Sequence, residues 1–185
     1  MIENVTIAKS ATAKIADRNL TLQTVGAGIR AKKVAVVNVK VYVTQLMLSD
    51  SAHYVRTDAG ALDSASTSPS SALKLDFLRA VDAQTVQLAF RDSLVANQVD
   101  LNDTGIKAFL DAVSAGGDAA QGKALTIVLE HLPTGQEAVT YEDNAGKATT
   151  VVGGQGLIRK ILSIWLGKPA DSGLNNLKKS LIEGN

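Results

Sequence analysis

The longest β-prone run of this chain extends from Val25 to Leu48 and constrains the fold more than any other segment. From Val37 to Val43 every second residue is valine, which predicts a strand with one apolar face. The opposite face is polar or aromatic, with Asn38, Lys40, Tyr42 and Thr44. The function of the chain depends on whether that second face meets water or a ligand.

The run opens with Gly26-Ala27-Gly28, and Arg30 follows. Neither this segment nor Gly153-Gly154 completes a dinucleotide or P-loop motif, so we interpret both as turns and bulges. A guanidinium cannot lose its charge at physiological pH, so Arg30 needs an anion if its surroundings are apolar. That anion is either an acidic side chain of the chain itself or a bound ligand.

Composition excludes several classes of function. The net charge of +1 lacks the basic excess typical of nucleic-acid binding. The chain has no cysteine and only two histidines, which argues against thiol chemistry, a zinc site or a histidine-based triad. No run of eighteen apolar residues occurs, so we expect no membrane span. We also expect no metal and no cofactor.

Local patterns predict the order of elements along the chain. Residues 57–71 are rich in Ser, Ala and Thr, which predicts a long loop. A first strand is expected around Val5 to Ala11, and others at residues 20–25, 73–78, 125–130, 138–142 and 148–152. Helices are expected to begin near Asp82, Asp103, Gly156 and Asp171.

This order predicts an α+β fold, a large and mostly antiparallel sheet with a layer of helices on one face. Its 185 residues suffice for one domain, which we assign to residues 1–185. Tyr42 can donate to a carboxylate or simply pack with its hydroxyl in water. Asn97 shares a helix face with Phe90, and either bonds the backbone at the helix end or lines a pocket.

Four segments carry a resemblance to a known family: Gly26 to Arg30, Lys40 to Val43, Leu78 to Asn97, and Ile164-Trp165-Leu166-Gly167. In this order and spacing they resemble the chalcone isomerase-like proteins, and the last segment is typical of bacterial members. The resemblance implies a cleft between a large antiparallel sheet and its helices.

The resemblance also implies which residues line that cleft. Plant chalcone isomerases use an arginine, a threonine, a tyrosine, an asparagine and a late Ser or Thr. The corresponding residues here are Arg30, Tyr42, Phe90, Asn97 and Ile164. Since Phe90 and Ile164 lack the hydroxyls that would stabilise charge on substrate oxygens, we expect no catalytic residue.

Fatty-acid-binding relatives of this fold pair the arginine with a tyrosine at the position of Tyr42. The resemblance therefore implies a non-catalytic protein that binds a fatty acid or similar apolar carboxylate. The alternatives are an intramolecular lyase or isomerase for a small phenolic or enone substrate, and a structural protein without a pocket. In a single strand Arg30 and Tyr42 would lie about 40 Å apart, so the chain must fold back near residue 36.

The resemblance favours export to the periplasm, because the bacterial relatives are usually exported. The first sixteen residues lack the apolar segment of a signal peptide, so we do not expect one within this sequence.

Overall fold

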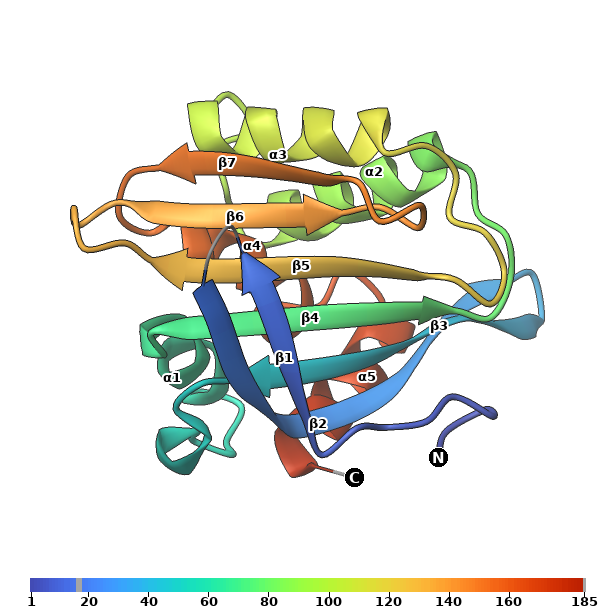
Figure 1. Cartoon of the computed structure of the whole chain (residues 1–185). Coiled ribbons are helices and arrows are strands. Elements are labelled where there is room, and N and C mark those ends of the chain that lie inside the picture. The colour runs from blue at the N-terminus through green and yellow to red at the C-terminus, as the bar shows by residue number, and fades with distance from the viewer. Residues whose placement is uncertain (16–17, 185) are drawn as a thin grey trace.

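The computed structural model describes residues 1–15 and 18–184, and its seven described strands form one antiparallel sheet (Figure 1). Neighbouring strands in the chain are neighbours in the sheet, in the order β1 to β7. The strands are β1 (Ser10–Ile15), β2 (Arg18–Val34), β3 (Val37–Leu48), β4 (Ser70–Phe77), β5 (Ala124–His131), β6 (Glu137–Glu142) and β7 (Ala148–Gly153).

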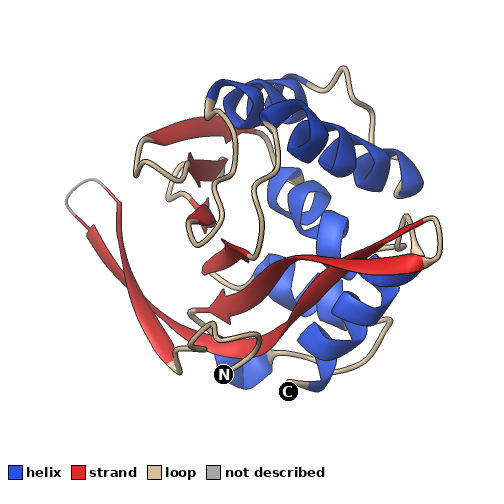
Figure 2. Ribbon diagram, turned by 90° about the vertical axis from the view of Figure 1, so that its right-hand side faces the viewer, coloured by secondary structure: helices blue, strands red, loops and turns tan. Residues whose placement is uncertain are grey.

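The helices gather on one face of the sheet (Figure 2). They are η1 (Ser51–His53), α1 (Ala61–Thr67), α2 (Ala83–Ala96), α3 (Thr104–Ala115), α4 (Leu157–Leu166) and α5 (Ser172–Glu183). The main core lies between the two layers, with Trp165, Phe109 and Tyr141 among its largest buried side chains. This arrangement confirms the predicted α+β fold with helices on one face.

Strands β1 and β2 curl across the face that the helices leave open, so that β1 crosses in front of β4 and β5 in Figure 1. The curl encloses a second, small apolar cluster of Leu22, Met47, Ala72 and Val128. The sheet is therefore partly covered on both faces.

Most helix starts were predicted correctly from their capping residues. The carboxylate of Asp82 accepts a hydrogen bond from the Thr85 amide, and Asp103 caps α3 in the same way. Asp171 caps α5 by accepting from the Leu174 amide. The predicted turn at residues 143–146 joins β6 to β7, with Gly146 at a positive φ.

Two local predictions were wrong. Residues 57–71 contain α1 and the start of β4 rather than a continuous loop, because Ala61 and Ala65 are buried against the core. The polar composition of this segment hides these two buried alanines. The first strand begins at Ser10, and Val5 forms only an isolated bridge with Ile2.

Gly26 and Gly28 lie within β2 and do not form a turn. A Cβ on Gly26 would overlap the Leu181 backbone, and one on Gly28 would lie 2.6 Å from the Ser180 Cβ. Both glycines therefore allow α5 to pack directly on the strand. The predicted bulge is present beside them, where the register of β2 against β3 shifts at Val25.

A second register shift changes the faces of β3. Arg30 pairs with Tyr42 and Ala31 pairs with Lys40, so Val41 is one extra residue in β3. The predicted strict alternation was therefore wrong: Val41 and Tyr42 line the same side of the sheet. The predicted apolar face is also not buried at the start of the strand, where Val37 is 59% exposed.

Candidate functional site

Arg30 and Tyr42 lie directly opposite each other on β2 and β3. The chain folds back through a two-residue turn, Ala35-Val36, which the expected meeting of Arg30 and Tyr42 required near residue 36. Ala35 takes a left-handed conformation with φ of 53°, so the reversal occurs without the Asn or Gly that usually permits it. The two residues are brought together by strand pairing.

The anion that Arg30 requires is an acidic side chain of the protein. Its Nη1 donates to Asp171 Oδ1 at 2.9 Å, and its Nη2 donates to Asp171 Oδ2 at 2.5 Å. Nη1 also donates to the carbonyl oxygen of Ala31. Arg30 is only 6% exposed, so this two-point pair holds a nearly buried charge at the start of α5.

The pair also affects the ionisation of Asp171. Partial burial acts to raise the pKa of this carboxyl, but hydrogen bonds from Arg30 and the Leu174 amide outweigh it. The pKa of Asp171 therefore lies below its ordinary value, and the carboxylate is charged at neutral pH.

Arg30 keeps donor capacity beyond this pair. A guanidinium has five N–H groups, and three of them are used by Asp171 and Ala31. Among the described residues none accepts from Nε or from the second N–H of Nη2. That edge of the guanidinium matches the geometry of a second carboxylate.

Tyr42, which pairs with Arg30 across the two strands, is 7% exposed. Its hydroxyl oxygen accepts a hydrogen bond from Trp165 Nε1 at 3.3 Å, and its ring packs on Phe77. Burial raises the pKa of the phenol, against the opposing effects of Arg30 and the Trp165 bond. Among the described residues none accepts the phenol proton, so Tyr42 can still donate one hydrogen bond.

Both residues line a cavity of about 300 Å³ between the distal half of the β2–β3 hairpin and α2. Its wall is mainly apolar. The apolar lining residues are Val34, Val39, Val41, Phe77, Ala80, Val81, Val86, Ala89 and Phe90. An apolar cavity with a few convergent polar groups is the usual form of a small-molecule site.

The charges around the cavity are mostly positive. Lys32 and Arg79 line it in addition to Arg30, and neither forms an ion pair with a described residue. Asp82 is the acid among the lining residues, and its carboxylate is occupied by the Thr85 amide and hydroxyl. The local charge therefore favours an anionic group on a ligand.

The other predicted site residues lie in different places. Phe90 lines the cavity and packs edge-on against the Trp165 ring, with centroids 5.2 Å apart. Asn97 and Ile164 are not among the cavity's lining residues. Ile164 is 2% exposed in the core at α4.

Asn97 joins three backbone segments. Its Nδ2 donates to the carbonyl oxygens of Ser93, Ser163 and Lys168, and its Oδ1 accepts from the Lys168 amide at 2.7 Å. This is the first of the two alternatives that the sequence left open, a residue that bonds backbone at the end of α2.

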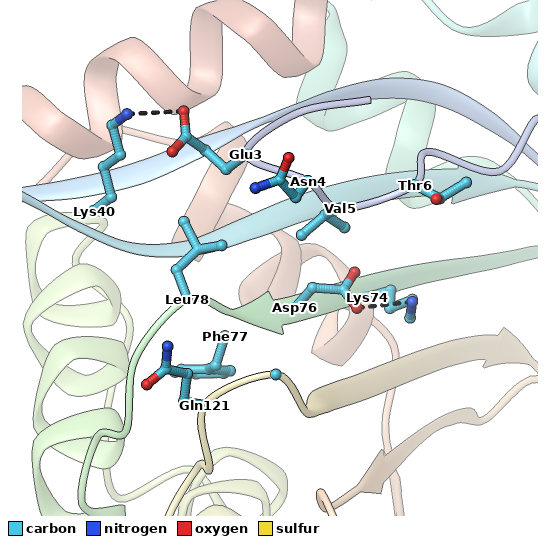
Figure 3. A pocket seen from close by; sticks show the side chains of 11 residues that line it. Glu3, Asn4, Val5, Thr6, Lys40, Lys74, Asp76, Phe77, Leu78 and Gln121 are labelled. Carbon is cyan, nitrogen blue, oxygen red and sulfur yellow. Dashed lines mark hydrogen bonds and ion pairs between the residues drawn. The ribbon is translucent and has the colours of Figure 1, made fainter.

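A larger hollow of about 650 Å³ lies on the opposite face, beneath the N-terminal segment (Figure 3). Its charged side chains are already paired, Lys40 with Glu3 and Lys74 with Asp76. It offers a ligand little uncompensated charge, so the smaller apolar cavity is the better candidate site.

Sequence reasoning missed Lys32, Arg79 and Asp171 as parts of this region. Both basic residues lie within segments that were singled out, Lys32 in Val25 to Leu48 and Arg79 in Leu78 to Asn97, so their charge was the available signal. Asp171 was recognised only as a helix cap. No sequence signal joins it to Arg30, because 141 positions separate them.

The chalcone isomerase-like family model matches residues 1–182. The chain belongs to the chalcone isomerase-like family. A comparison with curated proteins found no match. In this chalcone isomerase-like protein, Arg30 and Tyr42 lie opposite each other on β2 and β3.

In residues 1–15 and 18–184 no group of three or more His, Cys, Asp or Glu side chains is arranged to hold a metal ion. No helix in the same ranges is both long and apolar enough to cross a bilayer.

Proposed function

We propose that this protein binds a fatty acid or a similar apolar carboxylate in the cavity between the β2–β3 hairpin and α2. The observation that carries the proposal is an apolar cavity lined by three cationic side chains, Arg30, Lys32 and Arg79, and by the phenol of Tyr42. The free edge of Arg30 and the Tyr42 proton would hold the carboxylate, and Asp171 would keep its own bonds.

The cavity size sets the length of the buried tail. About 300 Å³ is the volume of roughly ten water molecules. A chain of about ten carbons occupies a similar volume at roughly 30 Å³ per heavy atom, so decanoate is a suitable test ligand. Each buried CH₂ contributes about 0.8 kcal/mol, so the tail supplies most of the affinity. The charged head contributes about 2–4 kcal/mol and sets the orientation.

The first experiment measures ligand binding directly. Organic extracts of the purified protein are analysed by mass spectrometry, and decanoate is titrated by calorimetry. We expect bound acyl chains in the extract and a rise in melting temperature with added decanoate. An extract without acyl chains, together with no rise in melting temperature, would contradict the proposal.

A matched pair of variants locates the binding. Ala89→Trp places an indole in the cavity and should weaken decanoate binding at least tenfold, because it fills the space for the tail. Gln84→Trp puts the same side chain on α2 outside the cavity lining, where it should leave binding unchanged. Equal affinities for the two variants would exclude this cavity as the site.

A second comparison tests the head group. Decanol has the same tail as decanoate without its charge, so wild type should bind decanoate more tightly. Tyr42→Phe removes the donor and should reduce that preference. A protein that binds both ligands equally, before and after the substitution, would contradict the role of Arg30 and Tyr42.

A further inference from the structure

The tip of the β2–β3 hairpin exposes an unusual group of apolar side chains. Val34, Val36 and Val37 are 57%, 90% and 59% exposed, and they account for three of the eight large hydrophobic side chains that are exposed in the described chain. The hairpin reaches the right-hand edge of the molecule in Figure 1. Three exposed valines gathered at one turn are a candidate interaction surface.

The turn itself favours the same interpretation. A two-residue hairpin turn usually contains Asn-Gly or Asp-Gly, since these residues adopt positive φ at little cost. Here Ala35 adopts a φ of 53° and Val36 follows it. The hairpin thus accepts backbone strain while presenting apolar side chains at its most exposed point, which indicates a function for them.

The charged side chains around the tip are all basic. Between residues 18 and 49 the chain has no Asp or Glu, although its net charge is only +1. Lys32 and Lys33 are exposed beside the valines, and neither forms an ion pair with a described residue. Lys40, further along the hairpin, pairs with Glu3.

We infer that this tip, residues 32–37, is a contact surface for the face of an anionic lipid bilayer. Valine side chains would enter the boundary between head groups and acyl chains, while Lys32 and Lys33 meet the lipid phosphates. A neutral apolar partner would make no favourable contact with the two unpaired lysines. A purely acidic partner would make no favourable contact with the valines. A bilayer with anionic lipids matches both.

The tip is continuous with the candidate cavity, because Lys32 and Val34 belong to both. If the proposed function holds, an apolar carboxylate could pass between bilayer and cavity along the hairpin without crossing bulk water. The contact with the bilayer itself does not depend on that function, and it is tested separately.

The experiment is flotation of the full chain with vesicles. We expect the protein to float with vesicles of phosphatidylcholine and phosphatidylglycerol at 3:1 in low salt. It should not float with phosphatidylcholine alone, and salt should weaken the association. Val36→Asn with Val37→Thr should reduce binding at least tenfold, and Lys33→Gln about fivefold.

The control is Val152→Thr with Lys147→Gln. It removes an exposed valine and an exposed lysine near β7, and should float like wild type. Wild type that stays in solution with anionic vesicles, or tip variants that float equally, would overturn the inference. Dimerisation that the valine substitutions abolish, without vesicle binding, would assign the tip to a second copy of the chain.

Decanoate affinity in solution separates this inference from the proposed function. The valine double variant should bind decanoate as wild type does, since Val36 and Val37 do not line the cavity. Vesicle binding without decanoate binding would overturn the proposed function and leave the bilayer contact standing. The reverse result would overturn the bilayer contact alone.

Discussion

Arg30 and Asp171 form a two-point ion pair that connects β2 to the first turn of α5. The guanidinium is nearly buried, while 39% of the aspartate side chain is exposed. The pair therefore sits at the boundary of the core, where a charged group from the N-terminal part of the chain meets a helix from its C-terminal part.

Asp171→Asn should lower stability in a pH-dependent way. The pKa of Asp171 is depressed in the folded state, so its ionised form stabilises the fold above the unfolded pKa of about 3.9 and loses that effect as pH falls further. Asparagine keeps the helix cap. Denaturation at several pH values should show the largest difference from wild type at pH 7, shrinking below about pH 4. A constant difference would contradict this role.

Gly173→Ala should destabilise the protein, although alanine is favoured over glycine in a helix by about 1 kcal/mol. A Cβ on Gly173 would overlap the Ala31 carbonyl oxygen and the Arg30 Nη1. The control is Gly105→Ala, also in the first turn of a helix, where the new Cβ meets the flexible end of Leu157 at 3.0 Å and Asp103 Oδ1 at an ordinary contact distance of 3.4 Å. Thermal melts should show a clearly larger loss for Gly173→Ala, and equal losses would argue against this contact.

Asn97→Ala should cost about 1–3 kcal/mol of unfolding free energy, because it leaves backbone groups at the end of α2 and after α4 without partners. Decanoate affinity should not change, since Asn97 does not line the cavity. Asn102→Ala is a suitable control, because Asn102 is exposed and, within the described part of the chain, its side chain bonds only Asp100. Loss of decanoate binding in a stable Asn97→Ala protein would show that Asn97 contributes to the binding site.

The tyrosines should resist ionisation in the folded protein. Burial raises the pKa of Tyr42, and it raises those of Tyr54 and Tyr141 to about 12. The unfolded chain loses these protons near pH 10, so stability should fall as pH rises from about 10 toward 12. Ultraviolet titration should show little tyrosinate at pH 10 until the protein is unfolded by denaturant. Early tyrosinate absorbance in folded protein would contradict the buried positions.

Local chemistry in the sequence predicted much of the fold. Apolar periodicity and capping aspartates at residues 82, 103 and 171 located the helices, and the glycine turn at residue 146 located a hairpin. These signals depend on residues close together in the chain. The helix at Ala61–Thr67 escaped prediction because its stability comes from packing of Ala61 and Ala65 against distant elements.

The site was harder to predict, for two physical reasons. The extra residue at Val41 brings Val39, Val41 and Tyr42 into one cavity, whereas strict alternation had placed Tyr42 on the other face. A bulge of this kind has no clear signature in a run of valines. Likewise, an arginine's need for an anion was evident, but nothing in the sequence selected Asp171 among 18 acidic residues.

The packing of α5 on the glycines of β2 can form only late in protein synthesis. Leu181, which rests on Gly26, leaves the ribosome 155 positions later, roughly 8–30 s at ordinary translation speeds. Throughout that interval no helix covers the surface of β2 at Gly26 and Gly28. In a nascent chain of this protein, this surface of β2 would thus stay uncovered until α5 has been synthesised.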